Sequence, residues 1–200
     1  MRVAALRIGG GPAEWRELGF AVDAGDTVTV GEVRLELVSQ AKRGSIASWT
    51  LDGVDVPDSV DGLLTESGER DAEATSHPNG VLAIDHVVVF TPSLERTTEA
   101  LAALGIECRR VREAGKGVRQ GFFLVGDVLL EVIDGTGLAD DEPARFWGIT
   151  LVVSDIDAAA ALLGERLGQV KDAVQPGRRI ATVRPDASGG LPLALITPRA

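Results

Sequence analysis

The sequence predicts an α+β fold in which two βαβββ modules follow one another, and three observations support this fold. Residues 81–134 alternate between strand-like and helix-like patterns in the order β-α-β-β-β. Residues 146–197 repeat that order. The two stretches also align in register, since His86 matches Gly148 and Glu131 matches Ala194, with one shifted residue in between. Agreement in both order and register predicts an internal duplication.

Each element of the first module has a local signal. Val81–Phe90 is a run of branched apolar residues, typical of a buried strand. The tripeptide Thr91-Pro92-Ser93 ends that strand and offers a helix N-cap, and apolar residues then recur at helical spacing until Gly105. The turn Gly126-Asp127 suits a tight hairpin. Three further strands are predicted at residues 106–111, 121–125 and 128–133.

The second module has weaker but parallel signals. Phe146–Val153 reads as a strand, and Ser154-Asp155 marks the start of a helix. The apolar stripe of that helix continues to Leu167, and Gly168 is predicted to end it. Later strands are predicted at residues 179–183 and 191–197, with a loop at residues 186–190.

The first 65 residues contain a shorter version of the same pattern. Strands are expected at residues 3–8, 20–22, 27–30, 33–38 and 46–51, a short helix at 12–18 and a helical turn at 59–64. Two interpretations stay open for this segment: a degenerate βαβββ-like module, or a β-rich extension that packs on the duplicated core. Residues 66–80 contain no Val, Ile, Leu or Phe and predict an exposed linker. The duplicated domain would then span residues 81–198.

Composition excludes several classes of function. The single cysteine, Cys108, excludes an internal disulfide framework and a cysteine-based zinc site. A net charge of −10 without a strong Lys/Arg cluster argues against nucleic acid as a partner. The sequence has neither a long apolar span nor a secretory signal, so we expect no membrane association and a cytoplasmic location. His77, followed by Pro78-Asn79-Gly80, is expected to belong to a turn.

Two motifs resemble one superfamily. The run Leu82–Pro92, with the sequence LAIDHVVVFTP, is followed by a helix and then by Gly126–Ile133, with the sequence GDVLLEVI. This arrangement resembles the glyoxalase, bleomycin-resistance and extradiol-dioxygenase (vicinal oxygen chelate) superfamily across residues 80–198. The resemblance implies paired modules that form a half-open barrel around a cup for a small molecule. It also implies a divalent metal (Fe, Mn, Zn, Ni or Co), with His86 and Glu131 as metal ligands and catalytic residues. Family members often pair modules across chains, which makes a homodimer a further expectation.

The second module lacks the corresponding ligands. Gly148 and Ala194 stand where its histidine and glutamate are expected, and neither side chain can bind a metal. A third ligand could come from the N-terminal segment, where Glu36 occupies the matching last-strand position. Two functions therefore stay open: a metal-dependent lyase or isomerase that uses His86 and Glu131, or a metal-free protein that binds or sequesters a small molecule, as in bleomycin resistance. Without metal, the same pair could act as a general base and its orienting group.

The alternation of side chains along a strand predicts which residues face the cup. Ile84, His86, Val88 and Phe90 should share one face of the first strand, and Leu129, Glu131 and Ile133 one face of the last. The same alternation directs Trp147 away from the cup. A buried carboxylate needs a partner, so Glu131 should either face the cup or pair with Arg119. The residues that could contact an anionic substrate from the later strands are Arg119, Gln120, Arg179 and Arg184.

Overall fold

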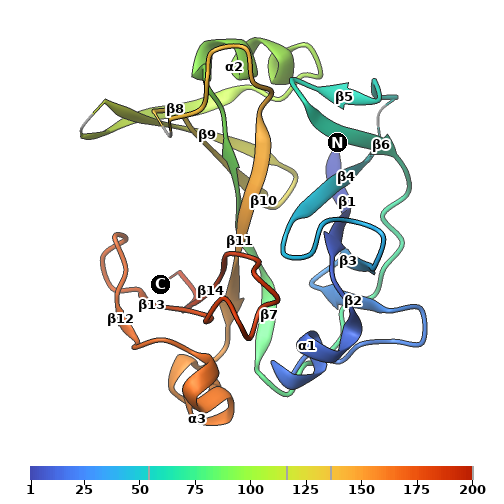
Figure 1. The fold of residues 1–200 in the computed structure, drawn as a ribbon, viewed down its shortest axis with the longest axis vertical. Helices are drawn as coiled ribbons and strands as arrows, with labels where there is room; N and C mark the ends of the chain where they lie inside the picture. Colours follow the sequence, from blue (N-terminus) through green and yellow to red (C-terminus); the bar gives the residue numbers. More distant parts are fainter. Residues whose placement is uncertain (54, 116, 136, 200) are drawn as a thin grey trace.

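Two open sheets pack against each other in the computed structural model, which describes residues 1–53, 55–115, 117–135 and 137–199. Figure 1 shows the N-terminal sheet on the right, against the convex side of the C-terminal sheet, whose two arms extend to the left. Helices α2 and α3 lie at opposite ends of the molecule. This α+β architecture with open, unclosed sheets agrees with the fold class that the sequence predicts. Within the described residues, no helix is long and apolar enough to cross a membrane.

The C-terminal sheet contains both predicted modules. The first consists of β7 (Val81–Phe90), α2 (Leu94–Ala102), β8 (Cys108–Gly115), β9 (Val118–Val125) and β10 (Val128–Ile133). The second consists of β11 (Arg145–Val153), α3 (Ile156–Leu163), the 3-10 turn η1 (Gly164–Arg166), β12 (Lys171–Asp172), β13 (Arg179–Thr182) and β14 (Leu193–Ile196). The strand order is β12-β13-β14-β11-β7-β10-β9-β8, so the modules meet where β7 and β11 pair antiparallel.

Strand pairing repeats between the two modules in the register that the sequence alignment predicts. Glu131 lies opposite Val88, and its counterpart Ala194 lies opposite Thr150. At the junction, His86 pairs with Thr150 while Gly148 pairs with Val88. Both relations are those of a pseudo-twofold axis between β7 and β11. Gly148 and Ala194 therefore occupy the positions of the missing second histidine and glutamate.

The N-terminal sheet repeats the strand order of the inner part of the C-terminal sheet. Its elements are β1 (Arg2–Gly9), α1 (Pro12–Glu17), β2 (Thr27–Val30), β3 (Val33–Val38), β4 (Ile46–Asp52), β5 (Ser59–Val60) and β6 (Leu63–Ser67). The order β2-β3-β1-β4-β6-β5 corresponds strand by strand to β9-β10-β7-β11-β14-β13, with the same parallel and antiparallel pairings. Glu36 lies opposite Arg7, as Glu131 lies opposite Val88. The N-terminal segment thus has the topology of a reduced pair of modules.

Three sequence predictions of local structure were wrong. Residues 20–22 do not form a strand, because Phe20 packs on Trp15 and the Ala21 N–H donates to Nδ1 of His77 at 3.1 Å. The predicted helical turn at residues 59–64 is instead the β5–β6 hairpin, turned by Asp61 and Gly62, both with positive φ. Helix α3 ends at Gly164, where φ is +55°, rather than at Gly168.

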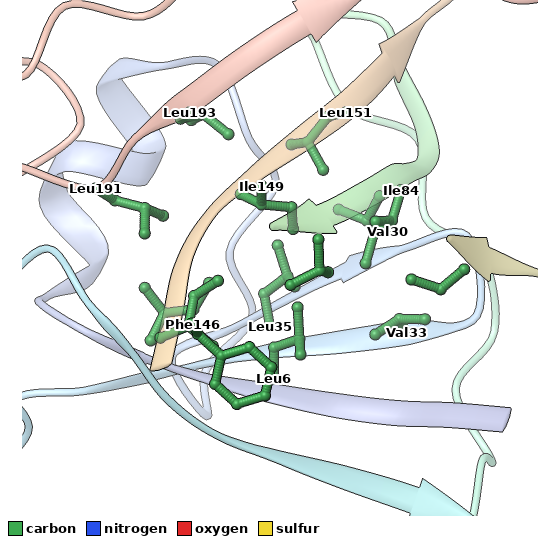
Figure 2. Close-up of a cluster of buried hydrophobic side chains, with 14 of the residues drawn as sticks. Leu6, Val30, Val33, Leu35, Ile84, Phe146, Ile149, Leu151, Leu191 and Leu193 are labelled. Carbon is green, nitrogen blue, oxygen red and sulfur yellow. The ribbon is translucent and has the colours of Figure 1, made fainter. Parts of the chain in front are cut away.

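The two sheets share one hydrophobic core. Figure 2 shows buried side chains of the N-terminal sheet, such as Leu6 and Leu35, beside Ile149 and Leu151 of β11. Residues 66–80, which connect the two sheets in the chain, also link them through side-chain contacts. Arg70 forms two hydrogen bonds of 2.8 Å with Asp127 in the β9–β10 turn. Nε of Arg70 also donates to the Glu32 carbonyl oxygen in the β2–β3 turn at 3.2 Å, so residues 66–80 contact both sheets.

Candidate functional site

The concave face of the C-terminal sheet carries two adjoining hollows. Their volumes are about 280 Å³ and 410 Å³, and His86, Glu131, Ile180 and Thr182 line both. Small-molecule sites usually have volumes of about 300–1,000 Å³. The cup that the sequence predicts is therefore present, and the two candidate site residues lie where its two hollows join.

Two β-bulges decide which side chains enter this cup. In β7, Asp85 is the extra residue between Ile84 and His86, whose partners Leu151 and Thr150 are adjacent in β11. In β11, Trp147 is the extra residue at the pseudo-symmetric position. An extra residue breaks the alternation of faces. Ile84 therefore lies in the core beside Leu151 and not on the face of His86, and Trp147 lines the smaller hollow instead of pointing away from it.

Asp85 fixes the orientation of the His86 ring. Its Oδ2 lies 2.8 Å from Nδ1 of His86, and Nη2 of Arg178 donates to its Oδ1 at 2.6 Å. Burial would raise the pKa of Asp85, but the hydrogen bonds from His86 and Arg178 and the charge of Arg178 lower that pKa to about 2. An ionised carboxylate only accepts hydrogen bonds, so the hydrogen must be on Nδ1 of His86. In the neutral ring, Nε2 then offers its lone pair to the cup.

Glu131 faces His86 from the neighbouring strand. Its Oε2 lies 3.6 Å from Nε2 of His86, and Nε2 of Gln120 donates to its Oε1 at 2.8 Å. Burial raises the pKa of Glu131, although the charge of His86, when its ring is protonated, and that of Arg112 oppose this effect. Glu131 therefore faces the cup, and it does not pair with Arg119, which contacts Glu95 and Asp134 instead.

The described side chains of the cup do not fit the metal site of three or four protein ligands that the resemblance implies. His86 and Glu131 would supply two ligands, and within the described residues no group of three His, Cys, Asp or Glu side chains could hold a metal ion. Position 148 is also sterically closed, because a Cβ added there would lie 2.5 Å from the Pro192 carbonyl oxygen. Glu36 lies on the other sheet, paired with Arg7 at 3.1 Å, and supplies no third ligand.

Most other residues singled out from the sequence have structural contacts outside the cup. His77 is buried, and its hydrogen bonds are those of a neutral imidazole. Its Nδ1 accepts from the Ala21 N–H, and its Nε2 donates to the Thr29 carbonyl oxygen at 2.9 Å. Arg179 binds Asp157, and Arg184 donates to the Glu165 carbonyl. Of the four side chains proposed to meet an anion, Gln120 alone lines the cup within the described residues.

Sequence reasoning missed four residues that shape the site. Asp85 and Arg178 orient His86, and Arg112 and Lys171 line the larger hollow. Asp85 immediately precedes His86, but ordinary alternation along the strand would direct it to the other face, so this adjacency did not predict its place in the site. Arg178 is far from His86 in sequence, so only the folded chain brings the two together.

Comparison with solved structures identifies the fold. The methylmalonyl-CoA epimerase of Mycobacterium tuberculosis aligns with 65% of this chain and 95% of its own, with a TM-score of 0.50 and 21% identity. The chain has the glyoxalase-like, vicinal oxygen chelate fold. A methylmalonyl-CoA epimerase of Streptomyces coelicolor in complex with 2-nitronate-propionyl-CoA aligns with 60% of this chain and 96% of its own, at 22% identity and a TM-score of 0.47. A hypothetical protein of Bacillus halodurans C-125 covers 58% of this chain and 94% of its own, at 14% identity and a TM-score of 0.47.

A scan against protein-family models and a search of curated proteins found no match. The glyoxalase-like fold accounts for the position of the cup, and the chemistry of the cup depends on the side chains of this chain. These place the half-buried side chains of His86 and Glu131 side by side between two hollows.

Proposed function

We propose that this glyoxalase-like protein is an isomerase that binds a small organic molecule in the C-terminal cup and moves a proton on it with His86 and Glu131. The observation that carries the proposal is the separation of 3.6 Å between Nε2 of His86 and Oε2 of Glu131, at the junction of the two hollows. The Mycobacterium tuberculosis structure that aligns with 65% of this chain is named an epimerase, and an epimerase is an isomerase.

The proposed step is a proton transfer at a carbon next to a carbonyl group. Nε2 of His86 takes the proton, because Asp85 holds the hydrogen of the neutral ring on Nδ1. Burial raises the pKa of Glu131, so its carboxyl group can supply a proton to the developing enolate. The electron pair of the C–H bond moves into the enolate, and return of a proton to carbon completes the isomerisation. Each group takes part as an acid or a base, and neither is consumed.

The test is deuterium exchange. The purified protein is incubated in D₂O with a panel of small 2-oxo acids and 2-methyl carboxylic thioesters, and with the corresponding alcohols as controls. Proton NMR follows the loss of the signal from the C–H bond next to the carbonyl group. We expect exchange at the carbon next to the carbonyl with wild-type protein, slowed by about 10²-fold or more in His86→Ala and Glu131→Gln. Glu36→Gln, at the equivalent position of the N-terminal sheet, should exchange at the wild-type rate.

A second function is favoured by the apolar half of the cup. Gly148 and Ala194 supply no reactive group, and Pro192 fills the space beside Gly148. A protein that only binds or sequesters its ligand would use this wall. Binding of panel members in the cup without exchange above the buffer rate would reject the isomerase proposal and favour the binding function.

A further inference from the structure

We propose, on the basis of the function proposed above, that the ligand is a small organic acid with an apolar body. The apolar body would occupy the smaller hollow beside Trp147, and the carboxylate would lie in the larger hollow between Arg112 and Lys171. The carbon that loses its proton would then lie between the apolar body and the carboxylate, next to His86 and Glu131.

The smaller hollow is suited to an apolar group. Apart from the reacting pair and two threonines, the side chains that line it are apolar: Val88, Ile133, Trp147, Ile180, Pro192 and Ala194. Ile149 and Leu193 also border it, but their side chains lie in the core between the sheets. Trp147 stacks on Phe90 with ring centroids 5.0 Å apart, yet 44% of its surface remains exposed. An apolar group that covers this indole would remove apolar surface from water, which contributes about 25 cal/mol per Å².

The larger hollow has the charge that an anion needs. Arg112 of β8 and Gln120 of β9 line this hollow from one arm of the sheet. Lys171 of β12 lines it from the opposite arm. Both cationic residues are exposed, and neither forms an ion pair with any described residue. Asp172 and Glu131 also line this hollow, and burial raises the pKa of Glu131, so when Glu131 is protonated two cationic side chains face one carboxylate. The charge of Arg112 reaches Glu131, which places it close to the reacting pair.

Other arginines near the cup are already engaged. Arg119 binds Glu95 and Asp134, Arg178 binds Asp85, and Arg179 binds Asp157. A ligand carboxylate that approached one of these three would have to compete with a protein carboxylate. Arg112 and Lys171 carry no such partner in the described chain, so the anion is expected between them.

The pseudo-symmetry supports this division of the cup. The bulge in β7 supplies Asp85 and His86, and the equivalent bulge in β11 supplies Trp147 and Gly148. One module thus presents an acid–base group and its orienting carboxylate at the position where the other presents an indole and no side chain. The two halves of the cup therefore differ in chemistry, one for reaction and one for apolar contact.

The test compares acids with their neutral amides. Binding of hexanoate and hexanamide, and of indole-3-acetate and indole-3-acetamide, is measured by calorimetry with the full-length protein. Because hydrogen bonds to charged groups are the stronger ones, we expect each acid to bind about tenfold more tightly than its amide. Arg112→Gln and Lys171→Gln should reduce this preference, whereas Trp147→Ala should weaken acid and amide alike. Arg16→Gln and Lys42→Gln make the same charge changes outside the cup and should leave the preference unchanged.

Equal affinity for acid and amide, no binding of any of the four probes, or the same loss in the Arg16 and Lys42 controls would overturn the ligand class. Deuterium exchange reports separately on the proton transfer. A preserved preference for acids without exchange of any substrate would reject the isomerase and leave the ligand class in place.

Discussion

Glu131 is a carboxylic acid buried in a largely apolar strand, and this burial has consequences for stability. Its raised pKa means that the folded chain binds the proton more tightly than the unfolded chain does. This contribution to stability is present below the pKa of the unfolded chain and is lost as pH rises through the folded pKa. Above that folded pKa, the protein must hold an ionised carboxylate in a site that disfavours it.

We predict that Glu131→Gln stabilises the protein at higher pH while abolishing proton transfer. The amide keeps an oxygen for the hydrogen bond from Gln120 and cannot ionise. Urea unfolding of both proteins should show a difference that favours the variant, grows as pH rises above the ordinary pKa of a glutamic acid, and levels off above the folded pKa. Glu36→Gln is the control, since it removes ion pairs with Arg7 and Arg34 and should bring no such gain. A constant difference at all pH values would contradict the prediction.

Asp85 is predicted to select the tautomer of His86. The chain has two histidines, so the ring ¹⁵N signals of His86 can be assigned by comparison with a His77 variant. The wild-type protein should show hydrogen on Nδ1 of the neutral ring, and Asp85→Asn should populate both tautomers. Unchanged ¹⁵N shifts would contradict this role.

The same aspartate is predicted to stabilise the fold. Its pKa of about 2 lies below its ordinary value, so its contribution is present above that ordinary value and is lost as pH falls toward 2. Asp85→Asn leaves the buried Arg178 without a carboxylate, which should cost about 3 kcal/mol in the free energy of unfolding. Adding Arg178→Met should recover part of the loss, because both charges are then absent. An equal or larger loss in the double variant would contradict the ion-pair explanation.

The metal role of His86 and Glu131 stays a prediction of the resemblance, and metal content can decide it. Two protein ligands rarely hold a divalent ion tightly, so we expect wild-type protein purified without a His-tag to carry well below one equivalent of Fe, Mn, Zn, Ni or Co. A nearly full equivalent that is lost in both His86→Ala and Glu131→Ala would contradict this expectation and restore the metal site.

At the scale of elements, local patterns predicted the bounds of the strands better than the face of the sheet on which each side chain lies. The bounds of β7 and β10 agree with the prediction, because both are rich in branched apolar residues and lie between turn formers. The faces of Ile84 and Trp147 were wrong, because a bulge depends on pairing with a distant strand and leaves no local signal. The site was thus predictable for His86 and Glu131, which lie beyond the β7 bulge and on a regular strand. It was not predictable for Asp85, which the bulge itself brings to the site.

Gly148 provides the prediction at this scale. An added Cβ would meet the Pro192 carbonyl oxygen at 2.5 Å and the Pro192 Cβ at 2.8 Å. Pro192 immediately precedes β14 and lines the smaller hollow of the cup. Gly148→Ala should therefore lower the free energy of unfolding by about 1–3 kcal/mol. Gly11→Ala is the matched control, since its nearest neighbour is a Glu14 side-chain oxygen at 3.8 Å and its φ is −117°. Equal effects of the two substitutions, measured by urea unfolding, would contradict the steric explanation.

At the scale of the whole molecule, the N-terminal sheet is a smaller copy of the C-terminal one that packs on its convex side. It has the bulges of the larger sheet at equivalent positions, at Ala4 and Ala47 of β1 and β4. Sequence analysis left a degenerate module and a simple extension open, because local patterns do not specify strand pairing. The strand order and pairing, which depend on contacts across the sheet, are those of a reduced pair of modules.

The shared core predicts that the two sheets unfold together. Leu6 in the N-terminal sheet and Leu151 in the C-terminal sheet are both fully buried in the cluster between them. Leu6→Ala and Leu151→Ala should each lower the free energy of unfolding by about 2–5 kcal/mol, and Leu162→Ala, at a position 51% exposed, by much less.

The transitions should coincide by circular dichroism and by tryptophan fluorescence, because Trp15 and Trp49 report on one sheet and Trp147 on the other. A variant in which the N-terminal sheet melts first, while Trp147 keeps its native emission, would show that the core is not shared energetically. The cup would then be a property of the C-terminal sheet alone. A single transition would mean that the N-terminal sheet stabilises the convex side of β7 and β11, and through them the strand that carries His86.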